Sequence, residues 1–568
     1  MQHLLLHFRR STSHVKRRIH GQEHGQELSQ GRRQEPESDI QPEDQEFVER
    51  DAGTGRFLNA KGDGKPFKGV RREKLVTANR EDPEMTIVPT QPQTPAFTDA
   101  QLQQIQGFGI AGFRKDHQET LFVRVGSATG GKQLVAWLAP QVANAWEVGT
   151  FNALFKEVRD RTGDEPLAVV WTGLLVSATG LSALGVPTTD LTAPSADAFS
   201  AGMAARAAAI GDVQPQDVPS QWLAPFQPGA NQVHLAVIVA ADEVDDLAEQ
   251  VLAISNMVSE TGCEVVFQER GDTLPDPFTG HEHFGFKDGI SQPAVLGYDD
   301  PPQPNEPPGV TPGELVLGFP DNTGATAQTG TNWASGSFVV FRRLRQHVAA
   351  LRAFTAAGVA GANPALGGTA FAADMVGRWP DGAPVETNPT TDPGPGNDVN
   401  AFSFAADPMG VSCPVWAHVR KANPRDTTGL AGTADDSARH RMLRRGIPFG
   451  PALPAGATAD DGVDRGLHFF SVVADLERQF EFVQLNWLNN SNFPLGTPPP
   501  VPGPYGPPAS SPPNGPDPLV GEHDATAECL LEQSSGRVQF PVANEFVQVT
   551  AGEYFFLPSI AAIQAFGA

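Results

Sequence analysis

One mixed pattern of strand-like and helix-like segments occurs twice between about residue 100 and the C-terminus, and this repeat limits the folds open to the chain. Each copy has four apolar runs of strand length. The runs lie at residues 119–126, 167–176, 234–241 and 263–269 in the first copy and at 336–344, 412–419, 466–474 and 545–557 in the second. We therefore expect an α+β protein of two tandem units with antiparallel sheets.

Each copy also contains an amphipathic helical stretch, identified by apolar residues three or four positions apart. In the first copy, residues 242–260 have an apolar face formed by Val244, Leu247, Val251 and Val258. In the second copy, residues 345–354 have apolar side chains at positions 348, 351 and 354. Both stretches predict helices.

Glycine and proline are frequent, with 58 and 51 residues in a chain of 568. This exceeds their usual share and indicates long loops, which we place at 299–313, 380–398 and 495–520. The first of these loops marks the predicted domain boundary. We expect a polar, disordered N-terminal extension over 1–95, an N-terminal domain over 96–310 and a C-terminal domain over 311–568.

The formal net charge of −25 argues against nucleic acid as a partner, because the phosphate backbone would be repelled. Residues 1–33 nevertheless hold seven Lys/Arg against two acids. This segment is either a disordered extension, a misassigned start or a tail that contacts a membrane or an acidic partner.

No apolar run reaches the roughly 18 to 20 residues of a membrane span. We find no recognisable export signal, which leaves the location as cytoplasmic or unknown.

Three short segments contain residues suited to chemistry. In "GHEHFGFKDGISQP", 280–293, Asp288 lies between glycines, which by itself is typical of a turn with a capping aspartate. Residues 412–426 place His418 in an apolar run followed by Arg420, either as a core histidine or as a ligand. The third segment, 439–451, has four arginines, which form a solvated helix end or meet anions. Its arginines are Arg439, Arg441, Arg444 and Arg445.

In their order along the chain, these segments resemble the dye-decolourising peroxidases, which are haem enzymes. The family's GxxDG motif is "GFKDG" at 285–289, its CPxxAHxRKxNPR pattern falls on 413–425, and its RxGIPxG pattern falls on 444–450. The resemblance extends over roughly residues 100 to 568. Gly446, where one bacterial branch has asparagine, is similar to the longer A, C and D branches of the family.

The resemblance implies a pair of ferredoxin-like domains of the dimeric α-β barrel kind, with haem b held mainly by the C-terminal one. It implies that the enzyme reduces hydrogen peroxide and oxidises bulky aromatic donors such as dyes and phenolics. In that scheme His418 is the axial ligand of the haem iron. Asp288 shuttles the proton between the peroxide oxygens, and its glycines let the backbone approach the haem closely. Arg444 stabilises the charge that develops as the O–O bond breaks. The oligomeric state stays open.

Further roles follow from the same resemblance. A carboxylate that accepts the other N–H of the histidine would increase electron density at the iron, and we expect Glu481, with Asp475 and Glu477 as alternatives. Leu467 and Phe469 match apolar positions that line the distal pocket. Arg420 is a candidate for binding the haem propionates. Trp416 is either an electron relay for large donors or a packing residue.

Two other functions remain as alternatives. A haem carrier on the same fold would bind haem without oxidising donors. A metal-dependent hydrolase would use His281, His283 and Asp288, although their spacing is loose for a metal site. We expect His283 to be structural instead. The three cysteines, Cys263, Cys413 and Cys529, lie too far apart to predict a disulfide framework or a CxxC zinc site.

Overall fold

A computed structural model gives the fold of the chain. It divides into two compact units, one containing residues 94–568 and a smaller one within residues 10–93. The structure describes residues 37–40, 47–50, 57–61, 71–72, 97–162, 168–188, 195–230, 232–300, 302, 306–327, 330, 332–358, 368–425, 437–493, 514–522, 527–533, 536–542 and 545–568.

The smaller unit contains four short strands, which form an antiparallel and parallel sheet in the order β3-β2-β1-β4. They are β1 (Glu37–Ile40), β2 (Phe47–Arg50), β3 (Phe57–Lys61) and β4 (Arg71–Arg72). The sequence did not predict these strands within the extension. The remainder of the predicted extension, including the basic residues 1–33, lies outside the described residues.

The first half of the large unit has the strand order of a ferredoxin-like domain. Its strands lie in the order β8-β5-β7-β6, and each neighbouring pair is antiparallel. Helices connect β5 to β6 and β7 to β8, which gives the βαββαβ arrangement. The elements are β5 (His117–Arg124), α2 (Ala128–Leu138), α3 (Ala145–Thr162), β6 (Trp171–Ser177), β7 (Leu235–Ala241), α7 (Val244–Glu260) and β8 (Glu264–Asp272).

The second half repeats this order as β15-β9-β12-β11, again with antiparallel neighbours. A short β10 pairs with β12 beside β11. The elements are β9 (Ser337–Gln346), α8 (Val348–Ala357), α9 (Gly368–Val376), β10 (Leu443–Arg444), β11 (Ile447–Phe449), β12 (Gly466–Val473), the π-helical turns η6 (Glu477–Glu481) and η7 (Val483–Leu488), and β15 (Val547–Leu557). The predicted pair of tandem ferredoxin-like halves is confirmed.

The two sheets join at both edges. Gly271 of β8 pairs with Phe449 of β11, and Ser177 of β6 pairs with Phe555 of β15. Together with the pairing of β9 and β12, these contacts close eight strands into a ring. Residue 310, near which the domain boundary is predicted, lies between β8 and β9 along the sequence, but the strands on either side share one sheet. The boundary itself stays a prediction.

Side chains alternate between the two faces of a strand. In β9 and β12, one set of side chains therefore points into the ring and the other set points outward. Phe341 of β9 packs against Phe122 and Phe470, with 4.9 Å between ring centroids in both pairs. Leu344 of β9 and Phe469 of β12 belong to the other face and line a cavity. The sheet therefore contributes to the protein core on one side and forms one wall of a cavity on the other.

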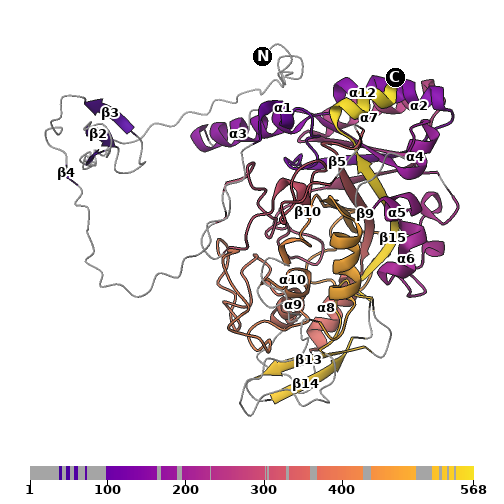
Figure 1. Cartoon of the computed structure of the whole chain (residues 1–568). Coiled ribbons are helices and arrows are strands. Elements are labelled where there is room, and N and C mark those ends of the chain that lie inside the picture. The colour runs from indigo at the N-terminus through magenta and orange to yellow at the C-terminus, as the bar shows by residue number, and fades with distance from the viewer. Residues whose placement is uncertain are drawn as a thin grey trace, which may run out of the picture. The chain divides into compact units, whose positions relative to one another are not determined.

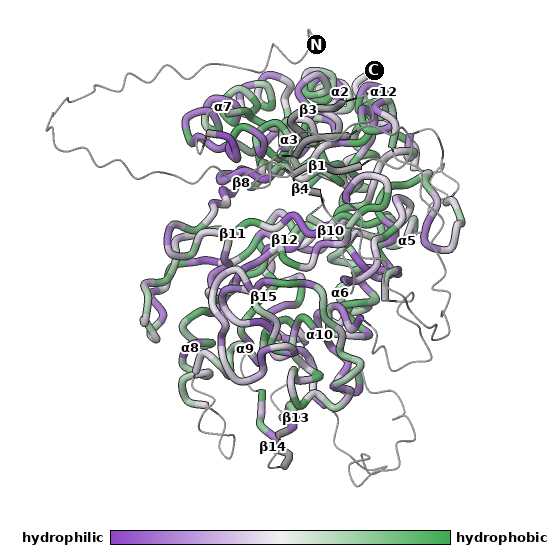
Figure 2. Tube along the Cα trace, turned by 90° about the vertical axis from the view of Figure 1, so that its left-hand side faces the viewer, coloured by the Kyte–Doolittle hydropathy of each residue, from purple (hydrophilic) through white to green (hydrophobic). Residues whose placement is uncertain are grey.

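Helices cover the outside of the ring at two ends (Figure 1). In that view α2, α7 and α12 lie together at one end, and α8, α9 and α10 lie at the other. Along α7, hydrophobic and hydrophilic residues alternate (Figure 2). Leu247, Val251 and Val258 are buried as predicted, but Val244 in the first turn is 40% exposed.

The other described elements are mostly short and connect the halves or extend their ends. No helix among the described residues is long and apolar enough to cross a membrane. The short connecting and terminal elements are α1 (Asp99–Leu102), η2 (Ala139–Gln141), α4 (Ala178–Ala183), α5 (Ala196–Ala201), α6 (Met203–Ile210), η3 (Pro219–Gln221), η4 (Ala224–Phe226), η5 (Pro312–Glu314), α10 (His418–Ala422), β13 (Glu528–Gln533), β14 (Gly536–Pro541) and α12 (Ile560–Gly567).

The strand predicted over 412–419 is absent: the chain turns there and then enters α10. The amide of Ala417 donates to the carbonyl oxygen of Pro414 at 3.0 Å, which closes the turn. Val415 and Trp416 are nevertheless buried, because this loop packs inside apolar clusters of the C-terminal half. The apolar run is therefore explained by a buried loop rather than by a strand.

Candidate active site

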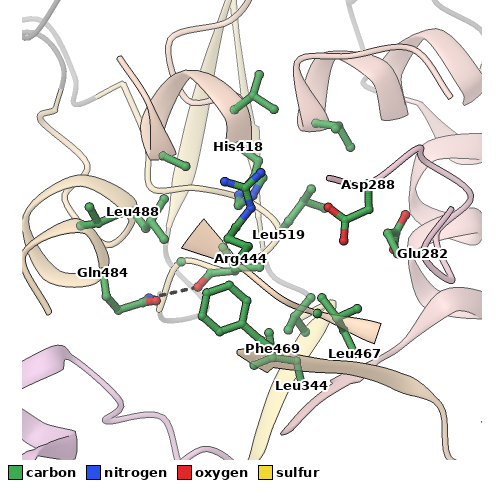
Figure 3. Close-up of a pocket in the computed structure, with 18 of the residues that line it drawn as sticks. Glu282, Asp288, Leu344, His418, Arg444, Leu467, Phe469, Gln484, Leu488 and Leu519 are labelled. Carbon is green, nitrogen blue, oxygen red and sulfur yellow. Dashed lines mark hydrogen bonds between the residues drawn. The ribbon is translucent and has the colours of Figure 1, made fainter. Parts of the chain in front are cut away.

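A cavity of about 330 Å³ lies against the outer face of β9 and β12 in the C-terminal half. Leu344, Leu467 and Phe469 form an apolar wall from these strands, and Leu488 and Leu519 add to it (Figure 3). His418, Asp288 and Arg444 also line this cavity. The fold therefore brings three segments together that lie far apart in sequence, as we predicted.

His418 is the first residue of α10, and its orientation is fixed by a buried carboxylate. Its Nδ1 atom lies 2.7 Å from Oδ2 of Asp517, which is fully buried. Because a carboxylate at neutral pH only accepts, Nδ1 is the donor and Nε2 is left as the basic nitrogen. Burial lowers the pKa of His418, but Asp517 outweighs it, so that this pKa lies above its ordinary value.

Asp517 is held by the turn that follows it. Its Oδ1 atom accepts hydrogen bonds from the amides of Leu519 (2.8 Å) and Val520 (3.2 Å). Both of these residues line the cavity. One carboxylate therefore orients the histidine and shapes a wall of the cavity at the same time.

The prediction that Glu481 would be the partner of His418 was wrong. The Glu481 carboxylate accepts from Nε of Arg206 and from the Tyr554 hydroxyl, each at 2.9 Å. The alternatives Asp475 and Glu477 instead interact with Ser195 and Arg206. All three acids lie at or next to the π-helical turn η6, which directs their side chains to these partners and away from α10.

Asp288 lies at the end of a tight loop, and its carboxylate faces the cavity (Figure 3). Its amide donates to the carbonyl oxygen of Gly280 at 3.1 Å, and its Oδ1 accepts from the amide of Gly289 at 2.6 Å. Gly285 and Gly289 have φ angles of 95° and 77°. The glycines of the motif are therefore required by the left-handed backbone of the loop.

Arg444 lies in β10, and Gln292 attaches it to the Asp288 segment. The Gln292 side chain accepts from the amide of Arg444 and donates to its carbonyl oxygen, both at 3.0 Å. Burial lowers the pKa of Arg444, while the charge of Asp288 opposes this effect. The solvated helix end that the arginine cluster predicted is wrong, since Arg444 is in a strand beside a cavity and Arg441 is buried.

The charges of His418, Asp288 and Arg444 influence one another across the cavity. Asp288 raises and Arg444 lowers the pKa of His418. The arrangement thus has a basic imidazole nitrogen, a carboxylate and a permanent cation around an apolar space. An imidazole with a carboxylate on its second nitrogen is the usual form of a metal-ligating histidine.

Arg441 is a better candidate than Arg420 for a ligand's carboxylates. Arg420 is fully buried outside the cavity, where it donates to the backbone oxygens of Cys413 and Asp407, so its predicted contact with propionates is wrong. Arg441 lines the cavity, and burial lowers its pKa to about 10. Within the described part of the chain it has only two contacts to carbonyl oxygens, of Pro308 at 3.4 Å and Ser291 at 3.2 Å. A buried guanidinium without a carboxylate favours an anionic ligand.

Trp416 and His283 both have the contacts of packed residues. Trp416 is fully buried, and its Nε1 atom donates to the carbonyl oxygen of Leu530 at 2.9 Å. His283 is buried with Nε2 2.8 Å from the carbonyl oxygen of Phe449, as expected. His281 contacts the carbonyl oxygen of Thr279. Among the described residues, no three His, Cys, Asp or Glu side chains gather to hold a bare metal ion, so the hydrolase alternative has no site there.

Comparisons with known proteins agree with this arrangement. Residues 104–275 match the family model described as the DyP dimeric alpha+beta barrel domain. A dye-decolorizing peroxidase of Mycena epipterygia is 31% identical over 525 residues, which cover 86% of this chain and 91% of the relative. The chain belongs to the dye-decolourising peroxidase family.

Solved structures of the family superpose on most of the chain. An ancestral D-type dye-decolorizing peroxidase is 29% identical, with a TM-score of 0.71, and the match covers 82% of this chain and 99% of that one. A dye-decolorizing peroxidase in complex with 2,6-dimethoxyphenol is 31% identical, with a TM-score of 0.66 and the same coverage of both chains. These similarities extend over both halves of the ring.

Sequence reasoning missed Asp517 and Gln292, which contact His418 and Arg444, and it missed Glu282, which lines the cavity. Asp517 stands in a proline-rich segment, 99 residues after His418, without a pattern that indicates its role. Gln292 and Glu282 lie within the segment 280–293 that drew attention to Asp288. Their position beside the motif was the one available signal.

Proposed function

We propose that the protein is a haem b peroxidase that reduces hydrogen peroxide with electrons from aromatic donors. The observation that supports it most is the position of Asp288 and Arg444 in the same cavity as His418, whose Nδ1 is held by Asp517. A relative in the same family binds 2,6-dimethoxyphenol, which is an aromatic donor of the expected kind.

The residues of the cavity fit a haem. His418 would bind the iron through Nε2, the apolar wall of Leu344, Leu467 and Phe469 would contact the ring, and Arg441 would bind a propionate. When bound, haem supplies the iron that exchanges electrons with peroxide and donor. The Asp517 carboxylate would keep the imidazole oriented and strengthen it as a ligand.

Asp288 and Arg444 divide the work on peroxide. The Asp288 carboxylate would accept a proton from one oxygen of hydrogen peroxide and return it to the other oxygen, which leaves as water. The Arg444 guanidinium would stabilise the negative charge on the departing oxygen. Leu467 and Phe469 would exclude water and large molecules, so electrons of bulky donors would reach the site through the protein. Trp416 as a relay on such a route stays a prediction.

The first experiment is a visible spectrum of the purified protein, supplied with haemin where needed, before and after one equivalent of hydrogen peroxide. We expect a Soret band that changes with peroxide and recovers with 2,6-dimethoxyphenol. A haem carrier would show a Soret band that peroxide only bleaches. Absence of haem uptake would contradict the role of His418.

Two variants connect the activity to the site. His418→Ala should lose stable haem binding and regain it partly with added imidazole, which replaces the missing ligand. Asp288→Asn should keep the Soret band and react with peroxide about 10²- to 10⁴-fold more slowly, because the proton acceptor is lost. Wild-type reaction rates in Asp288→Asn would exclude that residue as the proton carrier.

A further inference from the structure

Glu282 is another carboxylate that lines the cavity, and backbone amides of the loop before Asp288 donate hydrogen bonds to it. Its Oε2 atom accepts from the amide of Phe284 at 2.8 Å, and its Oε1 atom accepts from the amide of Phe286 at 2.9 Å. The backbone amide of Glu282 also donates to the carbonyl oxygen of Phe286 at 3.0 Å. The loop from 282 to 286 is therefore folded around this one side chain.

Glu282 also connects the loop to β9, a strand that contributes to the apolar wall of the cavity. Gln346, the last residue of β9, donates from Nε2 to Oε2 of Glu282 at 2.5 Å. Gln346 lines the cavity together with Glu282. Asp288 follows two residues after Phe286, so a carboxylate bound to both the loop and β9 limits where Asp288 can lie. Figure 3 shows the Glu282 and Asp288 side chains on the same side of the cavity.

We propose that Glu282 is a positioning residue for Asp288, which fixes the loop against β9 so that the Asp288 carboxylate stays over the haem cavity. This inference rests on the proposed peroxidase function. Glu282 acts through the loop and need not touch peroxide.

The chemistry of the site requires a carboxylate at this position. Three N–H donors converge on two oxygens, Oε1 with one donor and Oε2 with two. A glutamine has one accepting oxygen, and its amide nitrogen would face at least one of the N–H donors. A buried donor without an acceptor is costly, so the loop of a glutamine variant should move to relieve it.

The test is a double-mutant cycle on haem-loaded protein with Glu282→Gln, Asp288→Asn and the double variant. Two rate constants are measured by stopped flow: reaction with hydrogen peroxide and association of cyanide, which must lose a proton before it binds iron. Burial raises the pKa of Glu282 to about 7, so the measurements are made at pH 8, where its carboxylate is mostly ionised. The matched control is Glu553→Gln.

Glu553 is a suitable control because, like Glu282, it accepts hydrogen bonds from backbone amides and has a raised pKa, but it lies elsewhere. It is half-buried, desolvation raises its pKa to about 7, and its Oε1 atom accepts from two backbone amides, of Met203 and Tyr554. It does not line the cavity. Glu553→Gln therefore measures what loss of such a carboxylate does to the protein in general.

We expect Glu282→Gln to slow both reactions by about 10- to 100-fold, since small displacements of a catalytic group have effects of this size. Glu282→Gln should have no further effect once Asp288 is replaced, and Glu553→Gln should leave both rates unchanged. Wild-type rates in Glu282→Gln, or equal slowing with and without Asp288, would overturn the inference. If Glu282→Gln takes up no haem, Glu282→Asp decides: slower reactions support the role, and wild-type rates exclude it. Failure of the wild-type protein to react with peroxide would instead contradict the proposed function.

Discussion

Nδ1 of His418 lies 2.7 Å from Oδ2 of Asp517, a carboxylate 99 residues further along the chain. The pair connects the first turn of α10 to the turn at residues 517–520, and the His418 ring faces the cavity between them. The proposed iron ligand on a helix is thereby fixed by a residue outside the helix, so its geometry depends on the tertiary structure of the C-terminal half.

Replacement of Asp517 tests this relationship. Asp517→Ala should weaken haem binding by about 10- to 100-fold, because the outer partner of a ligating histidine is lost. Haem titration monitored at the Soret band measures it. The informative control is Glu481→Gln, the carboxylate that sequence reasoning favoured, which contacts Arg206 and Tyr554. Equal losses in the two variants would contradict the assignment of Asp517.

The rate of reaction with peroxide should depend on the shape of the side chain at position 444 as well as on its charge. Arg444→Leu should slow the reaction with peroxide by about 10²- to 10³-fold, as expected for loss of a charge-stabilising donor. Arg444→Lys should recover part of the rate, since lysine keeps the charge but has a single ammonium group. Stopped-flow measurement with haem-loaded protein distinguishes them. Identical rates for leucine and lysine variants would show that charge is not the contribution of this residue.

The stability of the ring should depend on pH through Glu269 of β8. Burial tends to raise the pKa of Glu269, but hydrogen bonds from His468 and Arg343 lower it to about 2. A folded pKa below the ordinary 4.5 means that the carboxylate stabilises the fold above pH 4.5 and that this contribution is lost as the pH falls towards 2. Urea midpoints of wild type and Glu269→Gln should therefore differ at pH 6 and approach each other at pH 3. Glu264→Gln, an exposed change on the same strand, should show no such convergence.

The aromatic interior should be the part of the ring least tolerant of truncation. Phe341→Ala should lower the free energy of unfolding by about 3 to 5 kcal/mol, because it removes a fully buried ring between Phe122 and Phe470. Denaturant unfolding measures the loss. Leu252→Ala, at a position that is 62% exposed, should change it by less than about 0.5 kcal/mol. Similar losses in both variants would argue against the ring interior as the main source of stability.

The sequence was informative where a local pattern reports a local structure. Continuous apolar runs such as 234–241 correctly predicted strands, because β7 is buried on both faces. The same criterion failed at 412–419, where the residues are apolar because a loop is buried among clusters. Composition alone does not distinguish these two forms of burial, since both exclude water from every side of the chain.

Within the site, motifs predicted residues that contact the cavity, and they did not predict the residues behind them. Asp288, His418 and Arg444 were identified from three segments that resemble a family. Asp517 was missed in favour of Glu481, because proximity in three dimensions between α10 and a proline-rich segment leaves no periodic signal. The strand pairings that close the ring, β6 with β15 and β8 with β11, could not be predicted from the sequence for the same reason.

Closure of the ring by β15 has a consequence for synthesis of the protein. This strand (Val547–Leu557) is the last of the eight ring strands along the chain, yet it pairs with β6 (Trp171–Ser177) and with β9. During translation, β6 and β9 therefore each keep one row of unpaired amides and carbonyls until the segment that forms β15 has left the ribosome. Exposed strand edges pair readily with other chains. Chains released before β15 is complete should accordingly be prone to aggregation and be the forms that most need chaperones.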